Sequence, residues 1–340
     1  MATTGRFRHL AKEALARLDA ARARRTAGAE SSPAPAGDGT YDGRYFGLGR
    51  NPFDRMGLSG YATYGRDTSN ADIAAYLLWR FFPVDRSLDV GCALGFVVEA
   101  LREVGIEAEG VDVSQWAVDH AAPGAVGHIR RGDLVEGIDV PDASFPLVTA
   151  LETLEHLPPD AVPGAIASLR RVTSGWVVVT IPSFGINDHG PHGFPNSKVR
   201  DDRLDHYIAL GTNFEGPIPQ DDLMRDADGE PIEGHLTIAS YRWWTARFAE
   251  AGLERCGEME RRIHPQLARF GLTEFWNLYV FRVPGTPLPP GPVRDADALI
   301  ERERMWRLSD RHAPERALMF LREGLGDEAV AEAQRPAPGI

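Results

Sequence analysis

Acidic residues that follow the ends of apolar runs are the part of this sequence best placed to do chemistry. Asp89 opens the stretch Asp89-Val90-Gly91-Cys92-Ala93-Leu94-Gly95, where a strand-like run turns through small residues into a helical pattern. Such a turn lets the backbone come close to a bound ligand. Asp112 ends the next apolar run 23 residues later. That spacing suits a carboxylate that accepts hydrogen bonds from both hydroxyls of a ribose, so we expect a nucleoside-containing cofactor here.

A second set of chemically active residues combines carboxylates with imidazoles. Glu152, Glu155 and His156 are spaced i, i+3 and i+4, so one helical turn would place them on one face. With His235 approaching from the other side, they form a site for a divalent metal such as Mg²⁺ or Mn²⁺. In the alternative, metal-free interpretation, the glutamate lies near the cofactor and His235 is a turn residue. The sequence leaves both open.

Candidate general bases are histidines near the end of the fourth predicted strand and in the long segment after the fifth. By position we select His156, His189 and His192 as catalytic candidates, and His206 has a comparable position. The segment 184–233 has little periodicity, so we expect an irregular insert that forms the acceptor pocket or a lid.

Strands and helices alternate from residue 86 onward, which predicts a parallel sheet covered on both faces. We predict strands at 86–91, 108–112, 126–130, 146–151, 175–181, 254–261 and 273–283. We predict helices near 73–82, 95–104, 115–121, 161–172 and 241–251. The acids and histidines above then lie at the carboxyl ends of the strands, where ligands bind in open α/β sheets.

The ordered motifs over about 85–283 resemble the class I S-adenosylmethionine (SAM) methyltransferases. Ala93 stands where that family usually has glycine, and Pro146 stands where aspartate is usual. The resemblance implies an α/β, doubly wound, mostly parallel seven-stranded sheet of Rossmann-like type. It implies contact of Asp133 with the adenine amino group. The cofactor-binding residues that it implies are Asp89, Gly91, Cys92, Gly95, Asp112, Val113, Asp133, Leu134 and Leu151.

A nicotinamide-dependent dehydrogenase shares the strand, turn and helix, but its Gly-x-Gly-x-x-Gly pattern needs glycine at positions now held by Ala93 and Phe96. The Glu-x-x-Glu-His pattern with a distant histidine is similar to ubiquinone-biosynthesis O-methyltransferases and to small-RNA terminal 2′-O-methyltransferases. That resemblance implies metal ligation by Glu152, Glu155, His156 and His235. A metal there would hold two neighbouring oxygens and lower the pKa of a hydroxyl acceptor.

Three regions follow from composition and pattern. Residues 1–40 are expected to form an amphipathic helix and a linker, and 41–285 the SAM-binding methyltransferase domain with its acceptor-site insert 184–233. Within that domain, Tyr61 and Tyr64 are candidates to cover the cofactor. Residues 286–340 are expected to be a C-terminal helical extension. Packing or self-association is the expected role of the terminal helices, which would give a homo-oligomer.

Charge and composition limit the partners. The chain of 340 residues has 37 basic and 49 acidic residues, a formal net charge of −12, which argues against a nucleic-acid partner. Its lysines are Lys12 and Lys198 alone. Two cysteines without metal-ligand spacing and the lack of an apolar run of about 20 residues favour a cytoplasmic protein without a membrane span.

We therefore expect an enzyme that methylates a hydroxyl of a small molecule or sugar. An N-methyltransferase or an RNA-terminal 2′-O-methyltransferase is the second hypothesis. A catalytically silent scaffold with this fold is the third, and Ala93 and Pro146 are the features that favour it.

Overall fold

The computed structural model describes residues 41–47, 64–66, 69–187, 190–192, 198–210, 213–225, 229, 231–269 and 277–294. These residues all belong to the unit Gly37–Glu301. The expected N-terminal helix and linker at 1–40, the part of the C-terminal extension beyond 294, Tyr61 and His189 lie outside the described residues.

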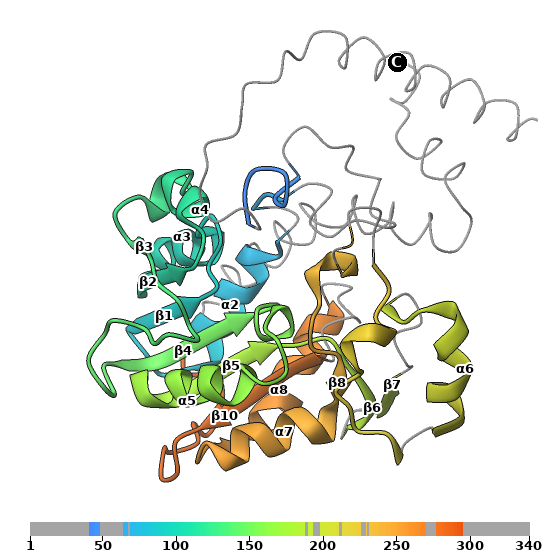
Figure 1. Cartoon of the computed structure of the whole chain (residues 1–340). Coiled ribbons are helices and arrows are strands. Elements are labelled where there is room, and N and C mark those ends of the chain that lie inside the picture. The colour runs from blue at the N-terminus through green and yellow to red at the C-terminus, as the bar shows by residue number, and fades with distance from the viewer. Residues whose placement is uncertain are drawn as a thin grey trace, which may run out of the picture. The chain divides into compact units, whose positions relative to one another are not determined.

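A seven-stranded sheet forms the centre of the described unit, in the order β3-β2-β1-β4-β5-β10-β9 (Figure 1). Its strands are β1 (Arg86–Val90), β2 (Glu107–Asp112), β3 (Ile129–Arg131), β4 (Phe145–Leu151), β5 (Thr173–Thr180), β9 (Glu254–Arg255) and β10 (Leu278–Arg282). The first five strands pair in parallel, and β10 runs antiparallel to β5 and β9. The predicted doubly wound, mostly parallel sheet is confirmed.

Helices cover the sheet in two groups. The first group has α2 (Ala71–Phe81) in contact with α3 (Phe96–Glu103) and α8 (Gly257–Arg269), and the second has α5 (Val162–Val172) in contact with α7 (Tyr241–Glu250). In Figure 1, α5 and α7 lie together on the near side of the sheet. Because both faces are covered, strand residues such as Val177, Val178 and Val179 are all buried. Within the described ranges, no helix combines the length and the apolar character needed to span a membrane.

Two strand predictions differ from the structure. The strand expected at 254–261 is wrong after its first two residues, because α8 begins at Gly257. Met259, Ile263 and Leu267 recur every four residues and are buried, which is a helical pattern. The third strand begins at Ile129 rather than 126, since the short helix η1 (Pro123–Ala125) precedes it and Val126 is exposed.

The insert is more ordered than its composition predicts. A second sheet has the order β7-β6-β8, from β7 (Gly190–His192), β6 (Ser183–Asn187) and β8 (Ala239–Ser240). Helix α6 (Asp201–Leu210) lies in the same region, and the short helices η5 (Gln220–Asp222) and η6 (Ile232–Gly234) follow it. An apolar cluster unites this region: Phe184, Val199, Tyr207, Ile218, Leu223 and Ile238. The expected irregular segment is therefore wrong, because its scattered apolar residues are brought together only when the chain folds.

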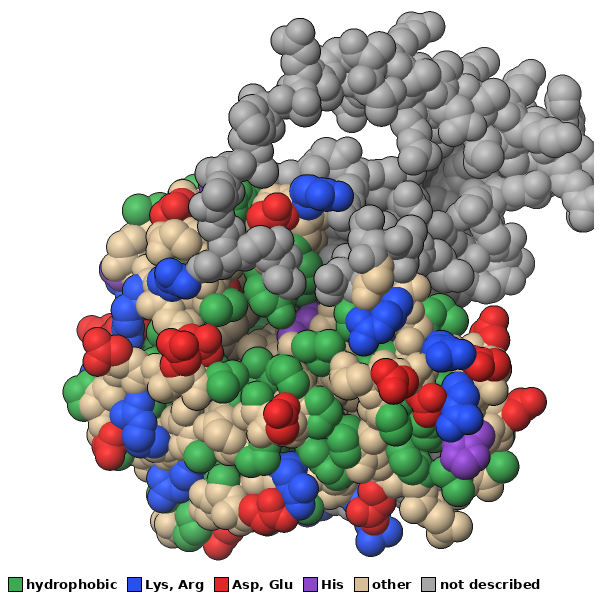
Figure 2. All heavy atoms as spheres, in the orientation of Figure 1, with side chains coloured by type: hydrophobic (Ala, Val, Ile, Leu, Met, Phe, Trp, Pro, Cys, Tyr) green, Lys and Arg blue, Asp and Glu red, His purple; other side chains and the backbone are tan. Residues whose placement is uncertain are grey.

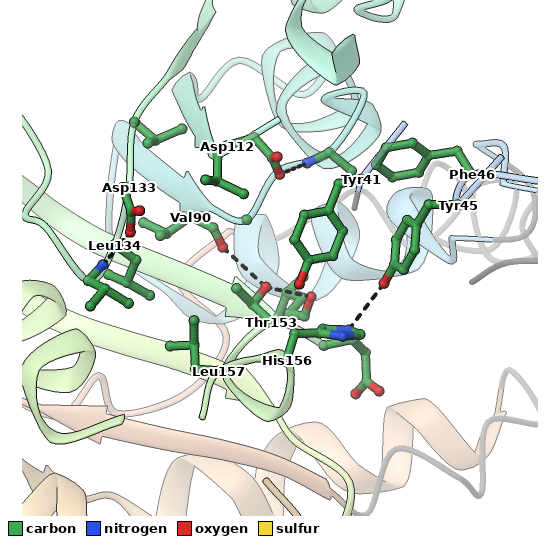
Figure 3. A pocket seen from close by; sticks show the side chains of 18 of the residues that line it. Tyr41, Tyr45, Phe46, Val90, Asp112, Asp133, Leu134, Thr153, His156 and Leu157 are labelled. Carbon is green, nitrogen blue, oxygen red and sulfur yellow. Dashed lines mark hydrogen bonds between the residues drawn. The ribbon is translucent and has the colours of Figure 1, made fainter. Parts of the chain in front are cut away.

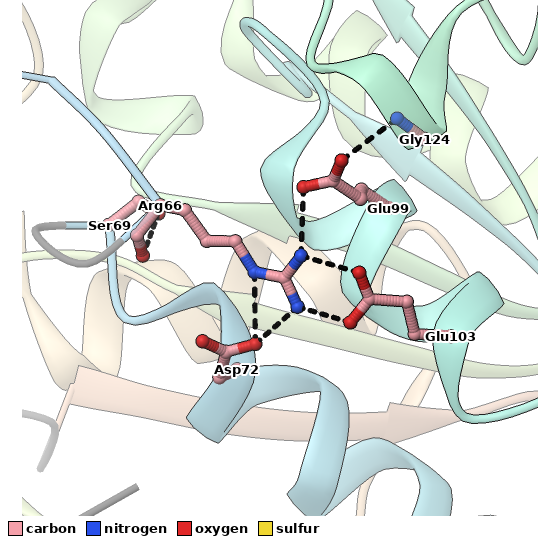
Figure 4. A network of polar contacts seen from close by, with 6 residues as sticks. All are labelled: Arg66, Ser69, Asp72, Glu99, Glu103 and Gly124. Carbon is pink, nitrogen blue, oxygen red and sulfur yellow. Dashed lines mark hydrogen bonds and ion pairs between the residues drawn. The ribbon is translucent and has the colours of Figure 1, made fainter. Parts of the chain in front are cut away.

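Arg66 joins the segment before α2 to α3 (Figure 4). Its guanidinium contacts the carboxylates of Asp72 at 2.6 Å, Glu99 at 2.9 Å and Glu103 at 2.5 Å. Glu99 also accepts a hydrogen bond from the Gly124 backbone N–H at 2.8 Å. A planar guanidinium can bond several carboxylates at once, so this network positions the chain around Tyr64.

Candidate active site

Two cavities adjoin at the carboxyl ends of β1, β2 and β4. The larger has a volume of about 230 Å³ and the smaller about 160 Å³. Tyr64, Gly91, Leu151 and Glu152 line both of them. The space-filling view shows the molecule hollowed at this face, with hydrophobic side chains around the hollow and histidine within it (Figure 2). This is the edge of the sheet where the sequence places its acids.

The turn after β1 has left-handed backbone at each of its small residues. Gly91 has φ 73°, Ala93 has φ 48°, and Gly95 has φ 78° and precedes the first residue of α3. A Cβ atom at Gly91 would lie 2.4 Å from the Thr153 side chain, so glycine is required there for space as well as conformation. The backbone of Ala93 thus has a conformation that favours glycine, although Ala93 has a side chain.

The methyl group of Ala93 is buried in an apolar cluster with Phe46 and Ala117. Burial of a methyl group contributes free energy of the same order as the cost of left-handed alanine. The alanine that departs from the family pattern is therefore compensated by a contact with a segment far upstream in the chain.

Asp112 holds the turns after β1 and β2 together. Its Oδ2 accepts the Ala93 backbone N–H at 2.7 Å, and its Oδ1 accepts the Ser114 backbone N–H at 2.8 Å. Burial raises the pKa of Asp112, and the two backbone hydrogen bonds oppose that rise. A carboxylate has about four lone-pair directions, so two acceptor positions remain for hydroxyl groups of a ligand.

The predicted cofactor residues divide between the two cavities. Those that line the larger cavity are Gly91, Asp112, Val113, Asp133, Leu134 and Leu151. Those that line the smaller are Asp89, Gly91, Cys92 and Leu151. Gly95 lines neither, and a Cβ atom there would lie 2.7 Å from Ala125, so its place is set by packing. The Asp133 Oδ1 accepts the Val135 backbone N–H at 2.7 Å.

Asp89 is buried below the turn, where its Oδ1 accepts a hydrogen bond from the Thr149 hydroxyl at 2.6 Å. Burial raises the pKa of Asp89 to about 7, and the nearby Asp112 carboxylate adds to that rise while Thr149 opposes it. A cationic group in the smaller cavity would favour the ionised form of this carboxyl.

The structure brings Glu155, His156 and His235 together at the end of β4. One possible ligand atom from each lies within 4.8 Å of the others. The short helix η2 (Leu154–His156) carries the first two, and the Glu155 carbonyl accepts the backbone N–H groups of Leu236 and Thr237. Those two hydrogen bonds bring His235 across from the insert. Glu152 precedes η2 with φ 51° and lines both cavities.

Hydrogen bonding sets the tautomer of His156. Its Nδ1 lies 3.0 Å from the Gly234 carbonyl, which can only accept, so Nδ1 carries the proton. Nε2 is then left with a lone pair, and the Tyr45 hydroxyl lies 3.5 Å from it (Figure 3). Burial lowers the pKa of His156 to about 4 and that of His235 well below its usual value. Both imidazoles are therefore neutral at physiological pH.

Glu155 is a fully buried carboxyl group. Among the described residues, no N–H or hydroxyl donor reaches either of its oxygens, and the Nδ1 of His235 has no hydrogen-bond partner. The Glu152 side chain is within hydrogen-bond range of Glu155, and the two carboxyl groups can bond only through a shared proton. Burial and then the neighbouring Glu152 carboxylate raise the pKa of Glu155 well above its usual value. Buried polar atoms without partners cost free energy, so these atoms need a proton or a cation between them.

The cluster at the end of β4 is costly to the fold. It buries the carboxyl of Glu155 and the imidazole of His235, and two non-glycine residues with left-handed backbone, Glu152 and Glu233, lie beside it. Backbone strain and unpartnered polar atoms persist where the surrounding structure enforces them, and they concentrate at functional sites. The two elements that enforce them here are η2 and the insert, joined by the hydrogen bonds of the Glu155 carbonyl.

Some residues of this site carry no motif that sequence reasoning could use. Tyr41, Tyr45 and Phe46 line the larger cavity from a segment upstream of every recognised motif. The buried Lys198 pairs with Glu233 and acts electrostatically on Glu152, His156 and His235. For Lys198 the only signal is its rarity, since the chain has one other lysine.

The remaining predicted histidines are not brought to this centre by any described contact. His189 and the side chain of His192 lie outside the described residues. His206 is exposed on α6, where its ring contacts Tyr207 at a centroid distance of 5.3 Å. Tyr64, expected to cover the cofactor, lines both cavities.

Comparison with known proteins identifies relatives of the central region. A family model described as a methyltransferase domain matches residues 61–255. The probable methyltransferase ltbC of Aspergillus luteorubrus is 30% identical over 143 residues, which are 37% of this chain and 50% of that protein. The ubiquinone biosynthesis O-methyltransferase of Alkalilimnicola ehrlichii is 31% identical over 152 residues, 42% of this chain and 60% of that protein.

The chain thus spans 50–60% of the length of these two curated relatives. Among solved structures, a SAM-dependent methyltransferase from Archaeoglobus fulgidus is 16% identical with a TM-score of 0.39, covering 64% of this chain and 95% of that one.

Gly91→Ala tests the turn after β1. Gly105 has a similar φ of 87°, and nothing lies within 4 Å of the place that a Cβ atom would take there, so Gly105→Ala is a matched control that introduces left-handed strain alone. We expect Gly91→Ala to lower the free energy of unfolding by about 2 kcal/mol more than the control, because its methyl group also meets Thr153. Urea denaturation of both variants measures the difference, and equal losses would contradict it.

Ala93→Gly and Phe46→Ala together test the compensation. In the wild type, Ala93→Gly should change the free energy of unfolding little, because relief of left-handed strain and loss of a buried methyl group are each about 1 kcal/mol. In the Phe46→Ala background the same change should stabilise the protein by about 0.5–1 kcal/mol. Additive effects in the double-mutant cycle would show that the two side chains are uncoupled.

Proposed function

The chain belongs to the methyltransferase domain family, and on that premise we propose that it transfers the methyl group of SAM to a hydroxyl of a small molecule or sugar. The observation that carries the proposal is the pair of adjoining cavities at Gly91, Leu151 and Glu152, with Asp112 in the wall of the larger. The net charge of −12 supports a small acceptor rather than a nucleic acid. Self-association through the terminal helices stays a prediction.

The residues present fit the parts of SAM. Asp112 has acceptor positions left for the ribose hydroxyls, and Val113 and Leu134 offer apolar surface beside them for adenine. The methionine part would lie at the junction of the cavities, between Gly91 and Leu151. The combined volume of the two cavities suits a nucleoside cofactor. Their walls are mainly apolar with a few acidic residues, which is typical of such sites.

When bound, SAM supplies a methyl group already activated by its sulfonium. The chain must therefore align the acceptor and keep water away, and both cavities are lined mainly by apolar side chains that exclude water. Glu152, at the junction of the cavities, presents a carboxylate where a cation would be held. Without a metal, the lone pair on His156 Nε2 provides an acceptor for the proton of the attacking hydroxyl; with a metal bound, the same lone pair would be a metal ligand and water would take the proton.

We also propose a divalent metal, Mg²⁺ or Mn²⁺, held by Glu152, Glu155, His156 and His235. The observations in its favour are that one possible ligand atom each of Glu155, His156 and His235 lies within 4.8 Å of the others, that Glu155 and His235 are buried, and that both imidazoles are neutral. Two carboxylates balance a divalent charge, while Lys198 is already balanced by Glu233. A bound metal would lower the pKa of a hydroxyl acceptor.

Asp112→Asn tests cofactor binding through S-adenosylhomocysteine, the demethylated product. The amide cannot accept at both positions, so the variant loses a charged acceptor that faces the ribose. We expect the Kd, measured by calorimetry, to rise at least about 10-fold, since a hydrogen bond to a charged group contributes about 1.5–3 kcal/mol. Asp142→Asn, in an exposed pair with Arg171, is the control and should leave the Kd unchanged. A Kd within twofold of the wild type would refute the role of Asp112.

Titration with Mn²⁺ tests the metal. The raised pKa of Glu155 means that the metal-free carboxyl is protonated and must lose that proton on binding, so affinity should increase with pH by up to about 10-fold per unit until Glu155 ionises. Calorimetry in two buffers of different ionisation enthalpy measures the released proton. Glu155→Gln should abolish binding, and Glu215→Gln, which is partly exposed, should not. No binding at millimolar Mn²⁺ at pH 8 would exclude the site.

A further inference from the structure

The segment Tyr41–Gly47 lies upstream of the residues that match the family model, yet it forms a wall of the larger cavity. Phe46 is buried and stacks on Trp116 of α4 (Gln115–Asp119) at a centroid distance of 5.5 Å and an angle of 17°. The Tyr41 carbonyl accepts the Ser114 hydroxyl at 2.5 Å, and the Phe46 carbonyl accepts the Tyr64 backbone N–H at 3.2 Å. These contacts fix the segment across the end of β2.

Within this segment, Tyr45 extends toward the reaction centre (Figure 3). The Asp42 carboxylate accepts the Tyr45 backbone N–H at 3.2 Å, which shapes the turn. The Tyr45 ring packs edge-on against Tyr41 at a centroid distance of 4.8 Å and against Phe46 at 5.2 Å. Aromatic contacts of this kind hold a side chain in one orientation, so the hydroxyl is directed at His156 Nε2, 3.5 Å away.

We propose that Tyr45 is the residue that selects an oxygen nucleophile, by donating a hydrogen bond to the acceptor atom while that atom attacks. The proposal rests on the proposed function and narrows its acceptor class to hydroxyl groups. A third atom at about 2.8 Å from both Tyr45 Oη and His156 Nε2 fits between them, because these two atoms are 3.5 Å apart. Both residues line the larger cavity, so their separation is compatible with an acceptor hydroxyl bonded to both.

The number of lone pairs explains the selection. One lone pair of the oxygen forms the new O–C bond. The S–C bond breaks at the same time, and the electron pair of that bond stays on sulfur. The proton of the hydroxyl passes to water. The second lone pair of the oxygen stays available to the Tyr45 O–H throughout. A neutral amine nitrogen has one lone pair, so an amine that accepts the Tyr45 hydrogen bond has none left for the attack, and Tyr45 can position only an oxygen nucleophile.

The test compares Tyr45→Phe with the control Tyr76→Phe, which removes a tyrosine hydroxyl on α2 from a residue that lines neither cavity. Transfer of labelled methyl from SAM is measured with catechol, benzyl alcohol, aniline and benzylamine as probes. We expect the wild type to methylate a hydroxyl probe, and Tyr45→Phe to lower kcat on it at least about 10-fold with little change in KM. Tyr76→Phe should stay within about twofold of the wild type.

Separate measurements distinguish the possible failures. The Kd for S-adenosylhomocysteine and the thermal midpoint should be unchanged in both variants, because the ring and its packing remain. A wild type that binds S-adenosylhomocysteine and methylates only the amines overturns this inference and leaves SAM use intact. A kcat for Tyr45→Phe within twofold of the wild type also overturns it. Absence of S-adenosylhomocysteine binding, or of any transfer, counts against the proposed function and this inference together.

Discussion

The Asp112 carboxylate accepts the backbone N–H groups of Ala93 and Ser114, and the site depends on this pair of hydrogen bonds. Parallel strands β1 and β2 end at the same edge of the sheet, and each continues into a turn with unpaired backbone donors. One buried carboxylate accepts a backbone N–H from each turn, and it still has acceptor positions that a ligand can use. The same group that closes the fold at this edge therefore also faces the cofactor cavity.

The unusual alanine in the turn after β1 shows how a departure from a family pattern is accommodated. Ala93 adopts a left-handed conformation, and its methyl group is buried in a cluster with Phe46. Phe46 belongs to the segment that also carries Tyr45 to His156. The conformation of the turn after β1 and the placement of Tyr45 beside His156 are thus linked through one apolar cluster, which lies partly outside the family domain.

The sequence by itself determined the central sheet, the turn after β1 and the acids at the strand ends. These features are local: continuous β-branched runs, small residues at a turn and a carboxylate at a strand terminus can each be recognised within a few residues. The same reasoning placed Glu152, Glu155 and His156 on one helical turn, and this is wrong for Glu152. The structure has Glu155 and His156 on the short helix η2, whereas Glu152 precedes it with left-handed backbone. Sequence reasoning did not identify α8, where a helical period follows a two-residue strand without a turn signal.

Only the tertiary structure decided which distant side chains meet. Tyr45 and His156 are 111 residues apart, and His156 and the Gly234 carbonyl are 78 apart. No local period encodes such pairs, because the order of the strands in the sheet and the paths of the loops determine which of these residues meet. The insert is a second example. Its apolar residues are scattered along the sequence, and they form a cluster only in the folded structure. The chemistry of the cofactor turn is local, whereas the acceptor side is built from contacts between segments far apart in the chain.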